Sequence, residues 1–447
     1  MWDAILVRLC LPWGHRSSRT SQEEVLERQA ASIVETLIAA APATLDLADE
    51  SQLEEVTSTA ERVVESFPTQ RELAELESVL CERKAEVPLA VHLAVKLARS
   101  RRVILDLDRP LHLSVVFAVY KEHHRILKRE QHENGENFLF AKLAQLRWLI
   151  ADQPRASFDL CLVDDGCPEG SGRIALELLA SSPPEEEVKV LFLADAIAGG
   201  VDVTRSLTTP DDSRKGGSIL FGMWAALQQQ REGHVVLMTD ADLSTNLGQC
   251  GLLVDPILNG GADAAIGSRR EPTSVVVKKG VRNTRGKLFI YLWKQILPEL
   301  AGIVDTQCGF KAFRAGPLRQ TVSDMIEMQF AFDIELLIKT ELRRRDSIRK
   351  VAIAWIDSEA ESTTIDLQPY LPMLRKMVEM SRKYLPVRPR AEAFAEFISE
   401  LDEQGWLRLL DAIPAAIAEA DPADFSSEGE VGVEQLRGLA RLSHQVV

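Results

Sequence analysis

The sequence predicts an α/β protein with a doubly wound, mostly parallel sheet and helical regions at both ends of the chain. Between about residues 110 and 356, short apolar runs of strand length alternate with stretches of helical periodicity. Most of these runs are apolar on both faces, as strands of a buried parallel sheet are. Acidic residues and glycines follow the runs directly, at the positions where open α/β sheets bind ligands.

The composition is that of a protein with a substantial core. The 447 residues are enough for two or three domains, with 46% hydrophobic and 27% charged residues. A net charge of −15 argues against nucleic acid as the main partner and against a polybasic membrane anchor. The sequence has no stretch typical of a membrane-spanning helix. Six cysteines without C-x-x-C spacing indicate a reduced, cytoplasmic protein. An apolar patch in the first residues leaves peripheral contact with a membrane open.

The first region, residues 1–108, is predicted to be helical. Apolar residues recur at helical spacing between Val25 and Ile38 and again around 53–66. Thr69 and Glu72 form a capping-box pattern that starts a further helix, and Pro88 precedes another. This region contains no cluster of residues typical of a catalytic or binding site.

The middle region, residues 109–368, carries the predicted sheet. We expect strands at 113–119, 158–163, 188–193, 235–238 and 262–266, and a helix that opens at Gly216. After Asp305 the pattern predicts a helix at 330–342 and a strand at 351–356. The last region, residues 369–447, is predicted to be helical and acidic.

Two carboxylates, Asp240 and Asp242, follow the apolar run at 235–238. They are two positions apart, so in extended backbone their side chains share one face. Carboxylate oxygens there could hold Mg²⁺ or Mn²⁺ against a diphosphate. The alternative is a solvated strand end or a helix N-cap.

Further polar residues follow the other strands, and the carboxyl ends of parallel strands meet at one edge of a sheet. Asp165 could accept a hydrogen bond from a nucleobase, and Lys215 with the following glycines could bind phosphate at a helix N-terminus. Arginines at 269, 282 and 285 could bind a second anion. Each feature also has an ordinary structural interpretation, as a turn, a helix cap or a salt-bridge partner.

These stretches resemble the family 2 glycosyltransferases with the GT-A fold, which contains a Rossmann-like nucleotide-binding half. The resemblance is closest to the branch of dolichyl-phosphate β-glucosyltransferases and polyprenyl-phosphate mannosyltransferases. It covers about residues 112–360, and six motifs occur in the family's order, at 116–122, 163–166, 215–223, 239–245, 266–269 and 305–311.

The resemblance implies a role for each matching residue. Asp242, with Asp240, would hold the metal, and transfer with inversion is expected. The residues expected at the donor nucleotide are Ala118, Tyr120, Glu122, Asp165, Lys215, Gly216, Asp240 and Ala241. A hydroxyl acceptor would need a general base, for which the candidates are Asp305, Asp333 and Glu335. A phosphate acceptor needs cations instead, for which the candidates are Arg269, Arg282, Arg285 and Lys311.

The sequence also departs from the family. Ala118 and Lys121 occupy positions where the family usually has proline and asparagine, and no transmembrane helices follow the middle region. From the resemblance we expect an inverting, metal-dependent glycosyltransferase that moves a hexose. The expected sugar is glucose, and the expected donor is UDP-glucose. The expected acceptor is either a polyprenyl phosphate or a soluble small molecule.

Two other functions stay open. One is a nucleotidyltransferase that makes a nucleotide sugar; the absence of a glycine-rich, arginine-containing loop after the first strand disfavours it. The other is a non-catalytic scaffold that only binds a nucleotide sugar, and the intact acid pair argues against it.

Overall fold

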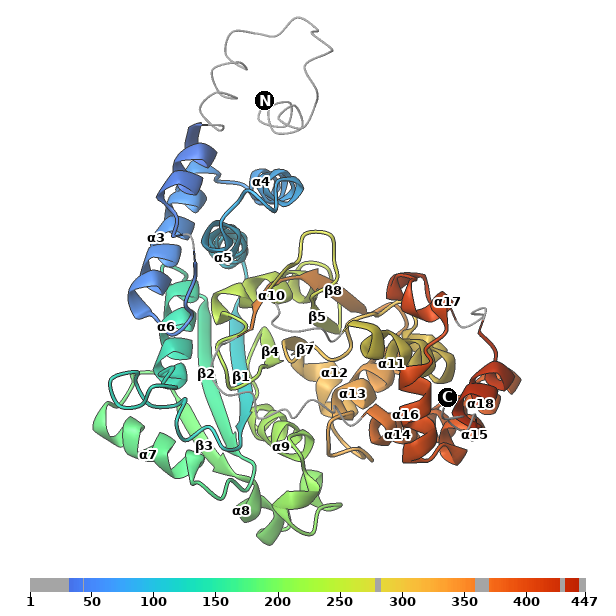
Figure 1. The fold of residues 1–447 in the computed structure, drawn as a ribbon. Helices are drawn as coiled ribbons and strands as arrows, with labels where there is room; N and C mark the ends of the chain where they lie inside the picture. The colour runs from blue at the N-terminus through green and yellow to red at the C-terminus, as the bar shows by residue number, and fades with distance from the viewer. Residues whose placement is uncertain (1–31, 43, 278–282, 358–369, 427–430, 442–447) are drawn as a thin grey trace, which may run out of the picture.

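The computed structural model describes residues 32–42, 44–277, 283–357, 370–426 and 431–441. Its centre is a seven-stranded sheet with helices on both faces (Figure 1). The strand order is β3-β2-β1-β4-β7-β5-β8, and every neighbouring pair is parallel except those of β7. The strands are β1 (Leu111–Val119), β2 (Ala156–Asp164), β3 (Val188–Phe192), β4 (His234–Met238), β5 (Ala264–Ser268), β7 (Lys311–Arg314) and β8 (Ile348–Ala352). The predicted α/β, doubly wound, mostly parallel sheet is confirmed.

Strand β7 was not predicted from the sequence. It lies antiparallel between β4 and β5, in the middle of the sheet. Only Ala312 and Phe313 separate Lys311 from Arg314, so the segment has no apolar run of strand length. The strand predicted at 351–356 is divided at Ile353 into the end of β8 and the short β9 (Ala354–Ile356), which pairs with β6 (Val275–Val277).

Alternation along the strands gives each face of the sheet its own apolar core. In β1, Leu113, Val115 and Phe117 belong to one core, and Val116 belongs to the other. The first core includes α3 (Glu50–Ser66), α4 (Gln70–Glu82), α5 (Leu89–Leu105), α6 (Phe138–Ile150) and α10 (Cys250–Leu258). The second core includes α9 (Gly216–Leu227), α11 (Asn283–Ile296), α13 (Phe332–Arg343), α14 (Tyr370–Tyr384) and α15 (Pro389–Glu400).

The N-terminal helices are attached directly to the sheet. The predicted capping box is present at the start of α4, between Thr69 and Glu72. The buried ammonium group of Lys96 in α5 lies 2.6 Å from Glu77 and donates to the carbonyl of Ala352 in β8 at 2.9 Å. The apolar residues of these helices and of the sheet form one continuous core. The boundary at 108/109 stays a prediction, as does the boundary at 368/369.

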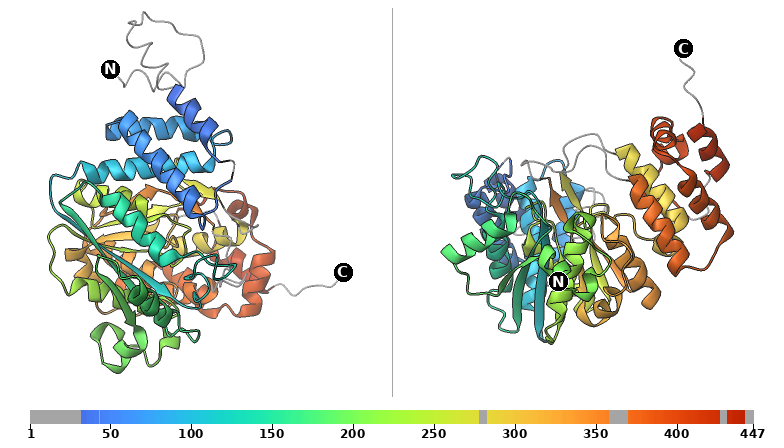
Figure 2. Two further views of the ribbon diagram at one scale, coloured as in Figure 1. Left: turned by 90° about the vertical axis from the view of Figure 1, so that its left-hand side faces the viewer. Right: turned by 90° about the horizontal axis from the view of Figure 1, so that it is seen from below.

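The C-terminal helices form a lobe beside the sheet, and α11 from the middle of the chain lies within it (Figure 2). Lys294 of α11 donates to the carbonyls of Pro422 and Phe425, and the hydroxyl of Tyr291 donates to the carbonyl of Val431. The other helices of the lobe are α16 (Glu403–Asp411), α17 (Ala415–Ala418) and α18 (Val433–Arg441). Among the described residues, every helix is too short or too polar to cross a bilayer.

Candidate active site

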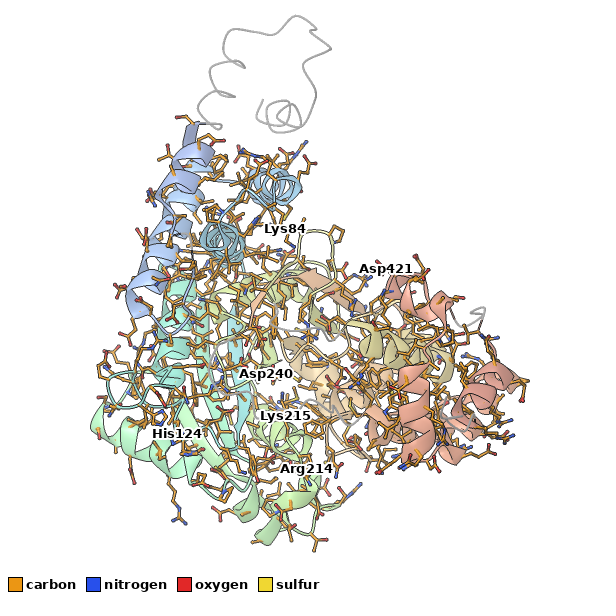
Figure 3. The ribbon with its side chains drawn as sticks, viewed as in Figure 1. Lys84, His124, Arg214, Lys215, Asp240 and Asp421 are labelled. Atoms are coloured by element: carbon orange, nitrogen blue, oxygen red, sulfur yellow. The ribbon has the colours of Figure 1, made fainter. Side chains whose placement is uncertain are left out.

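Polar side chains gather where β1, β2 and β4 end. Asp165 follows β2, and Asp240 and Asp242 follow β4. Lys215 is the residue before the first turn of α9, which packs on β1, β2 and β4. The side chains of Lys215 and Asp240 point toward one another across the end of the sheet (Figure 3).

A tight turn places Lys215. Its φ is 96°, and that of Arg214 is 47°, so two consecutive residues with a Cβ adopt left-handed conformations that are unfavourable for them. Asp165 holds the turn, because its carboxylate accepts from the backbone N–H of Lys215 at 2.7 Å and from the hydroxyl of Ser218 at 2.6 Å. Burial raises the pKa of Asp165, although these hydrogen bonds oppose the change.

Asp240 is surrounded by cations. Its Oδ1 atom forms an ion pair with the ammonium group of Lys215. Burial raises the pKa of Asp240, but the charge of Lys215, aided by Lys311 and Lys142, outweighs burial and holds this pKa below its ordinary value. The backbone of Gly309 passes so close that a Cβ there would overlap the Asp240 carboxylate.

Asp242 has a different set of partners. Its Oδ1 atom accepts from the backbone N–H of Ser244 at 3.0 Å, and its Oδ2 atom lies 3.7 Å from Arg125. The fully buried Lys142 donates to its backbone carbonyl at 2.7 Å. Burial lowers the pKa of Lys142 to about 8.

Glu122 shares Arg125 with Glu136. The guanidinium of Arg125 lies 3.0 Å from Glu122 and 3.2 Å from Glu136. Burial raises the pKa of Glu122 to about 7 despite the nearby Arg125, and the charge of Asp242 adds to the increase. The structure thus joins Glu122 to the acid pair through one arginine.

Two further ion pairs link acidic and basic residues for which the sequence predicts different roles. The Nε and Nη2 atoms of Arg269 donate to Asp305 at 2.8 and 2.6 Å. The ammonium of Lys311 donates to Asp333 at 2.8 Å, and Gln307 donates to the same carboxylate at 3.3 Å. Burial would raise the pKa of Asp305, but Arg269 holds it below its ordinary value.

Not every predicted site residue lies in this group. Glu335 is fully buried and accepts from the backbone N–H groups of Ile326 and Glu327, so it holds a loop. Arg285 lies on α11 and lines a surface cavity with Asp411 of the C-terminal lobe. Arg282 lies outside the described residues.

The remaining predicted donor residues lie at the same edge of the sheet. Ala118 is half-buried within β1, and Tyr120, which follows the strand, is 41% exposed. Ala241 is buried between the two aspartates. Gly216 lies beneath the backbone carbonyls of residues 328 and 329, so a Cβ there would clash with them.

No protein-family model matches the chain. Its relatives include the human dolichyl-phosphate β-glucosyltransferase, which is 26% identical over 241 residues, covering 52% of this chain and 66% of that protein. Over about half of its length, the chain is similar in sequence to dolichyl-phosphate β-glucosyltransferases. The dolichyl-phosphate β-glucosyltransferase ALG5D of Trichomonas vaginalis is 26% identical over 215 residues, covering 47% of this chain and 58% of that protein. The glycosyltransferase AglD of Haloferax volcanii is 25% identical over 233 residues, covering 50% of this chain and 36% of that protein.

The resemblance to this branch is therefore confirmed, and these three relatives are glycosyltransferases by name. The chain spans between 36% and 66% of their lengths. Among solved structures, the glucosyl-3-phosphoglycerate synthase of Mycobacterium tuberculosis in complex with Mg²⁺ and UDP is 17% identical. Its TM-score is 0.41, and the match covers 65% of this chain and 84% of that one.

Two side chains of the described site fit a divalent metal. The described residues contain no group of three or more typical metal-binding side chains. Asp240 and Asp242 nevertheless offer two carboxylates at one strand end, and Mg²⁺ is typically bound by one or two carboxylates together with substrate phosphates.

Arg125, Glu136 and Lys142 were not predicted from the sequence. The signal for Lys142 was present, because it falls on the apolar face of α6 with Phe138, Leu139, Leu143, Leu146 and Leu149. A lysine is almost never fully buried unless its ammonium group has a partner, so a lysine on such a face indicates a buried polar contact. Arg125 and Glu136 lie in an irregular segment without periodicity, so no sequence pattern identified them.

Proposed function

We propose that this protein is an inverting, metal-dependent glycosyltransferase that moves glucose from UDP-glucose to a polyprenyl phosphate such as dolichyl phosphate. The observation that carries the proposal is the acid pair at the end of β4, which faces Lys215 and the Asp165 turn. The names of the sequence relatives support the choice of sugar and acceptor. We also propose a cytoplasmic location with peripheral contact to the membrane that holds the lipid.

On the donor side, Asp165 would bind the nucleoside and fix the turn of Lys215 at the same time. Asp240 and Asp242 would hold Mg²⁺ or Mn²⁺, which would neutralise negative charge that develops on the leaving diphosphate. The ammonium group of Lys215 would add a second positive charge beside the same diphosphate. Arg125 would keep Glu122 and Asp242 in fixed positions.

On the acceptor side, the geometry favours a phosphate. Among the described candidates for a general base, Asp305 is paired with Arg269 and Asp333 with Lys311. Glu335 is enclosed by backbone amides. A hydroxyl acceptor would need one of these carboxylates to take its proton, whereas a phosphate is already an anion. Its oxygen would attack C1 of the sugar while the bond from C1 to the nucleoside diphosphate breaks.

The decisive experiment is transfer of radiolabelled glucose from UDP-glucose by the full chain with Mn²⁺, with and without dolichyl phosphate in detergent. We expect label in the lipid extract and release of UDP that depends on the lipid. GDP-mannose and UDP-N-acetylglucosamine serve as competing donors. Release of UDP that ignores the lipid would point to a soluble acceptor. Binding of the donor without turnover would support the scaffold, and release of diphosphate from a sugar phosphate and UTP would reveal a nucleotidyltransferase.

A further inference from the structure

The two aspartates of the proposed metal site have two different lysines. Lys142 is fully buried and donates to the backbone carbonyl of Asp242, so its ammonium has no route to solvent. Lys215 forms an ion pair with the carboxylate of Asp240 itself. The side chains of this second pair are 36% and 35% exposed, so a solute can reach them.

The backbone at Lys215 is fixed, but its side chain can move. The N–H of Lys215 is bound to Asp165, and the N–H of Gly217 donates to the carbonyl of Met328 at 2.8 Å. A lysine side chain has a flexible four-carbon stem that can turn about this fixed base. The ammonium can therefore leave Asp240 without any change in the fold.

The other cations around the acid pair are not free to exchange in this way. Lys311 is fully buried and bound to Asp333 and to the carbonyl of Cys308. Arg125 is held by Glu122 and Glu136, and it lies 3.7 Å from Asp242. Among the described residues, Lys215 alone combines an exposed side chain with a direct ion pair to a carboxylate of the acid pair.

We propose that Lys215 is the resident cation of the metal site, and that a divalent metal and a nucleoside diphosphate displace it together. In the metal-free protein its ammonium neutralises Asp240. A divalent metal that binds Asp240 must first displace this like charge, so metal alone binds weakly. A diphosphate gives the displaced ammonium a new partner, so metal and diphosphate strengthen each other's binding. This inference rests on the proposed metal-dependent function of the same site.

The test uses calorimetry to measure the binding of Mn²⁺ alone to the full-length wild type and to the variant Lys215→Met. The variant keeps the length of the side chain and removes the charge. We expect Lys215→Met to bind Mn²⁺ about tenfold more tightly, because the competing ammonium is gone, and to bind UDP less tightly in the presence of Mn²⁺. The wild type should show coupling of about tenfold between Mn²⁺ and UDP, and the variant less than about threefold. The binding curves are corrected for the complex that Mn²⁺ and UDP form in solution.

Two further variants separate charge from structure. Lys215→Arg keeps the positive charge and should bind Mn²⁺ as weakly as the wild type. Arg214→Met removes the same charge from the exposed neighbouring residue and should also leave Mn²⁺ affinity unchanged. Equal or weaker Mn²⁺ binding by Lys215→Met would overturn the proposal, as would an equal gain in Arg214→Met. Because Mn²⁺ binding is measured without a sugar donor, failure of the proposed transfer reaction would be recognised separately in the turnover assay.

Discussion

Arg269 and Asp305 form a fork in which Nε and Nη2 of the arginine donate to the two oxygens of the carboxylate, at 2.8 and 2.6 Å. The backbone N–H of Arg269 adds a third hydrogen bond to the same carboxylate, and the guanidinium lies 5.3 Å from the centre of the Trp355 ring. This pair joins the end of β5 to the segment before β7. It fixes the guanidinium of Arg269, which is a candidate contact of an acceptor phosphate.

Substitution Arg269→Lys should therefore impair transfer although it keeps the charge. Lysine cannot form two parallel hydrogen bonds or stack its head group on Trp355 in the same way. We expect kcat/KM for transfer to fall about tenfold to a hundredfold, which corresponds to about 1.4–3 kcal/mol. Steady-state kinetics at varied acceptor concentration would measure this. Kinetics unchanged from the wild type would show that the fork is not needed at the acceptor.

Loss of Asp242, a proposed metal ligand, should have a larger effect. We expect Asp242→Asn to remove several kcal/mol of transition-state stabilisation, which is about a hundredfold or more in rate. EDTA should give a similar loss in the wild type, and Mn²⁺ should restore it. Thermal unfolding provides the control, because a variant that is folded and inactive separates chemistry from stability. A variant with nearly full activity would exclude Asp242 as a metal ligand.

Gly309 offers a test of the close approach to Asp240. Substitution Gly309→Ala would place a Cβ on the Asp240 carboxylate and so move a proposed metal ligand. We expect transfer to fall about tenfold or more, since small displacements of catalytic groups are costly. Gly302 is the matched control, because a Cβ there meets no atom within 4 Å. Equal activity of Gly309→Ala and Gly302→Ala would contradict this geometry.

Two buried lysines should respond differently to replacement by methionine. Lys142→Met removes the hydrogen bond to the carbonyl of Asp242, and we expect kcat/KM to fall at least about tenfold. Lys96→Met removes a contact between the N-terminal helices and β8, so it should lower the unfolding temperature and leave kcat/KM unchanged. The two variants need the same pair of measurements, kinetics and thermal unfolding. Transfer impaired equally in both would mean that Lys142 acts only through stability.

The lowered pKa of the buried His234 predicts how the stability of the fold depends on pH. It lies at the start of β4, and its Nε2 atom is 2.9 Å from the hydroxyl of Ser114. Burial lowers the pKa of His234 to about 4, and the charge of His112 adds to the decrease. In the unfolded chain a histidine has a pKa of about 6.5. Between these values the unfolded state binds a proton that the folded state does not, so stability falls as the pH falls from about 6.5 to 4.

We expect His234 to contribute about 1–2 kcal/mol to the loss of unfolding free energy between pH 7 and pH 5. Urea unfolding at the two pH values would measure it. His234→Gln should reduce the difference between them. The same pH dependence in wild type and variant would assign the loss to other groups.

The sequence was sufficient where a pattern is local and long enough. The buried strand that ends at Asp240, the capping box of Thr69 and Glu72, and the helix that opens at Gly216 were all predicted from neighbouring residues. The convergence of Asp165, Lys215 and Asp240 followed from the rule that parallel strands end at one edge of a sheet.

The sequence was insufficient where partners lie far apart in the chain. Asp305 was predicted as a base and Arg269 as an anion ligand, and only the fold reveals that the two bind one another. Glu335 was predicted beside Asp333, but the two positions point to different surroundings on α13. Strand β7 is too short and too polar at its ends to be recognised, and it depends on β4 and β5 on either side for its hydrogen bonds.

The position of α11 has a practical consequence. This helix belongs by sequence to the middle of the chain, yet Tyr291 and Lys294 are bound to carbonyls near the C-terminus. A stop codon after α14 would remove Phe394 and Phe425, against which the buried ring of Tyr291 packs, and would leave that part of α11 facing water. Such a shortened protein would tend to aggregate rather than behave as a smaller transferase. The C-terminal lobe is thus an inseparable part of the enzyme's fold and not a detachable module.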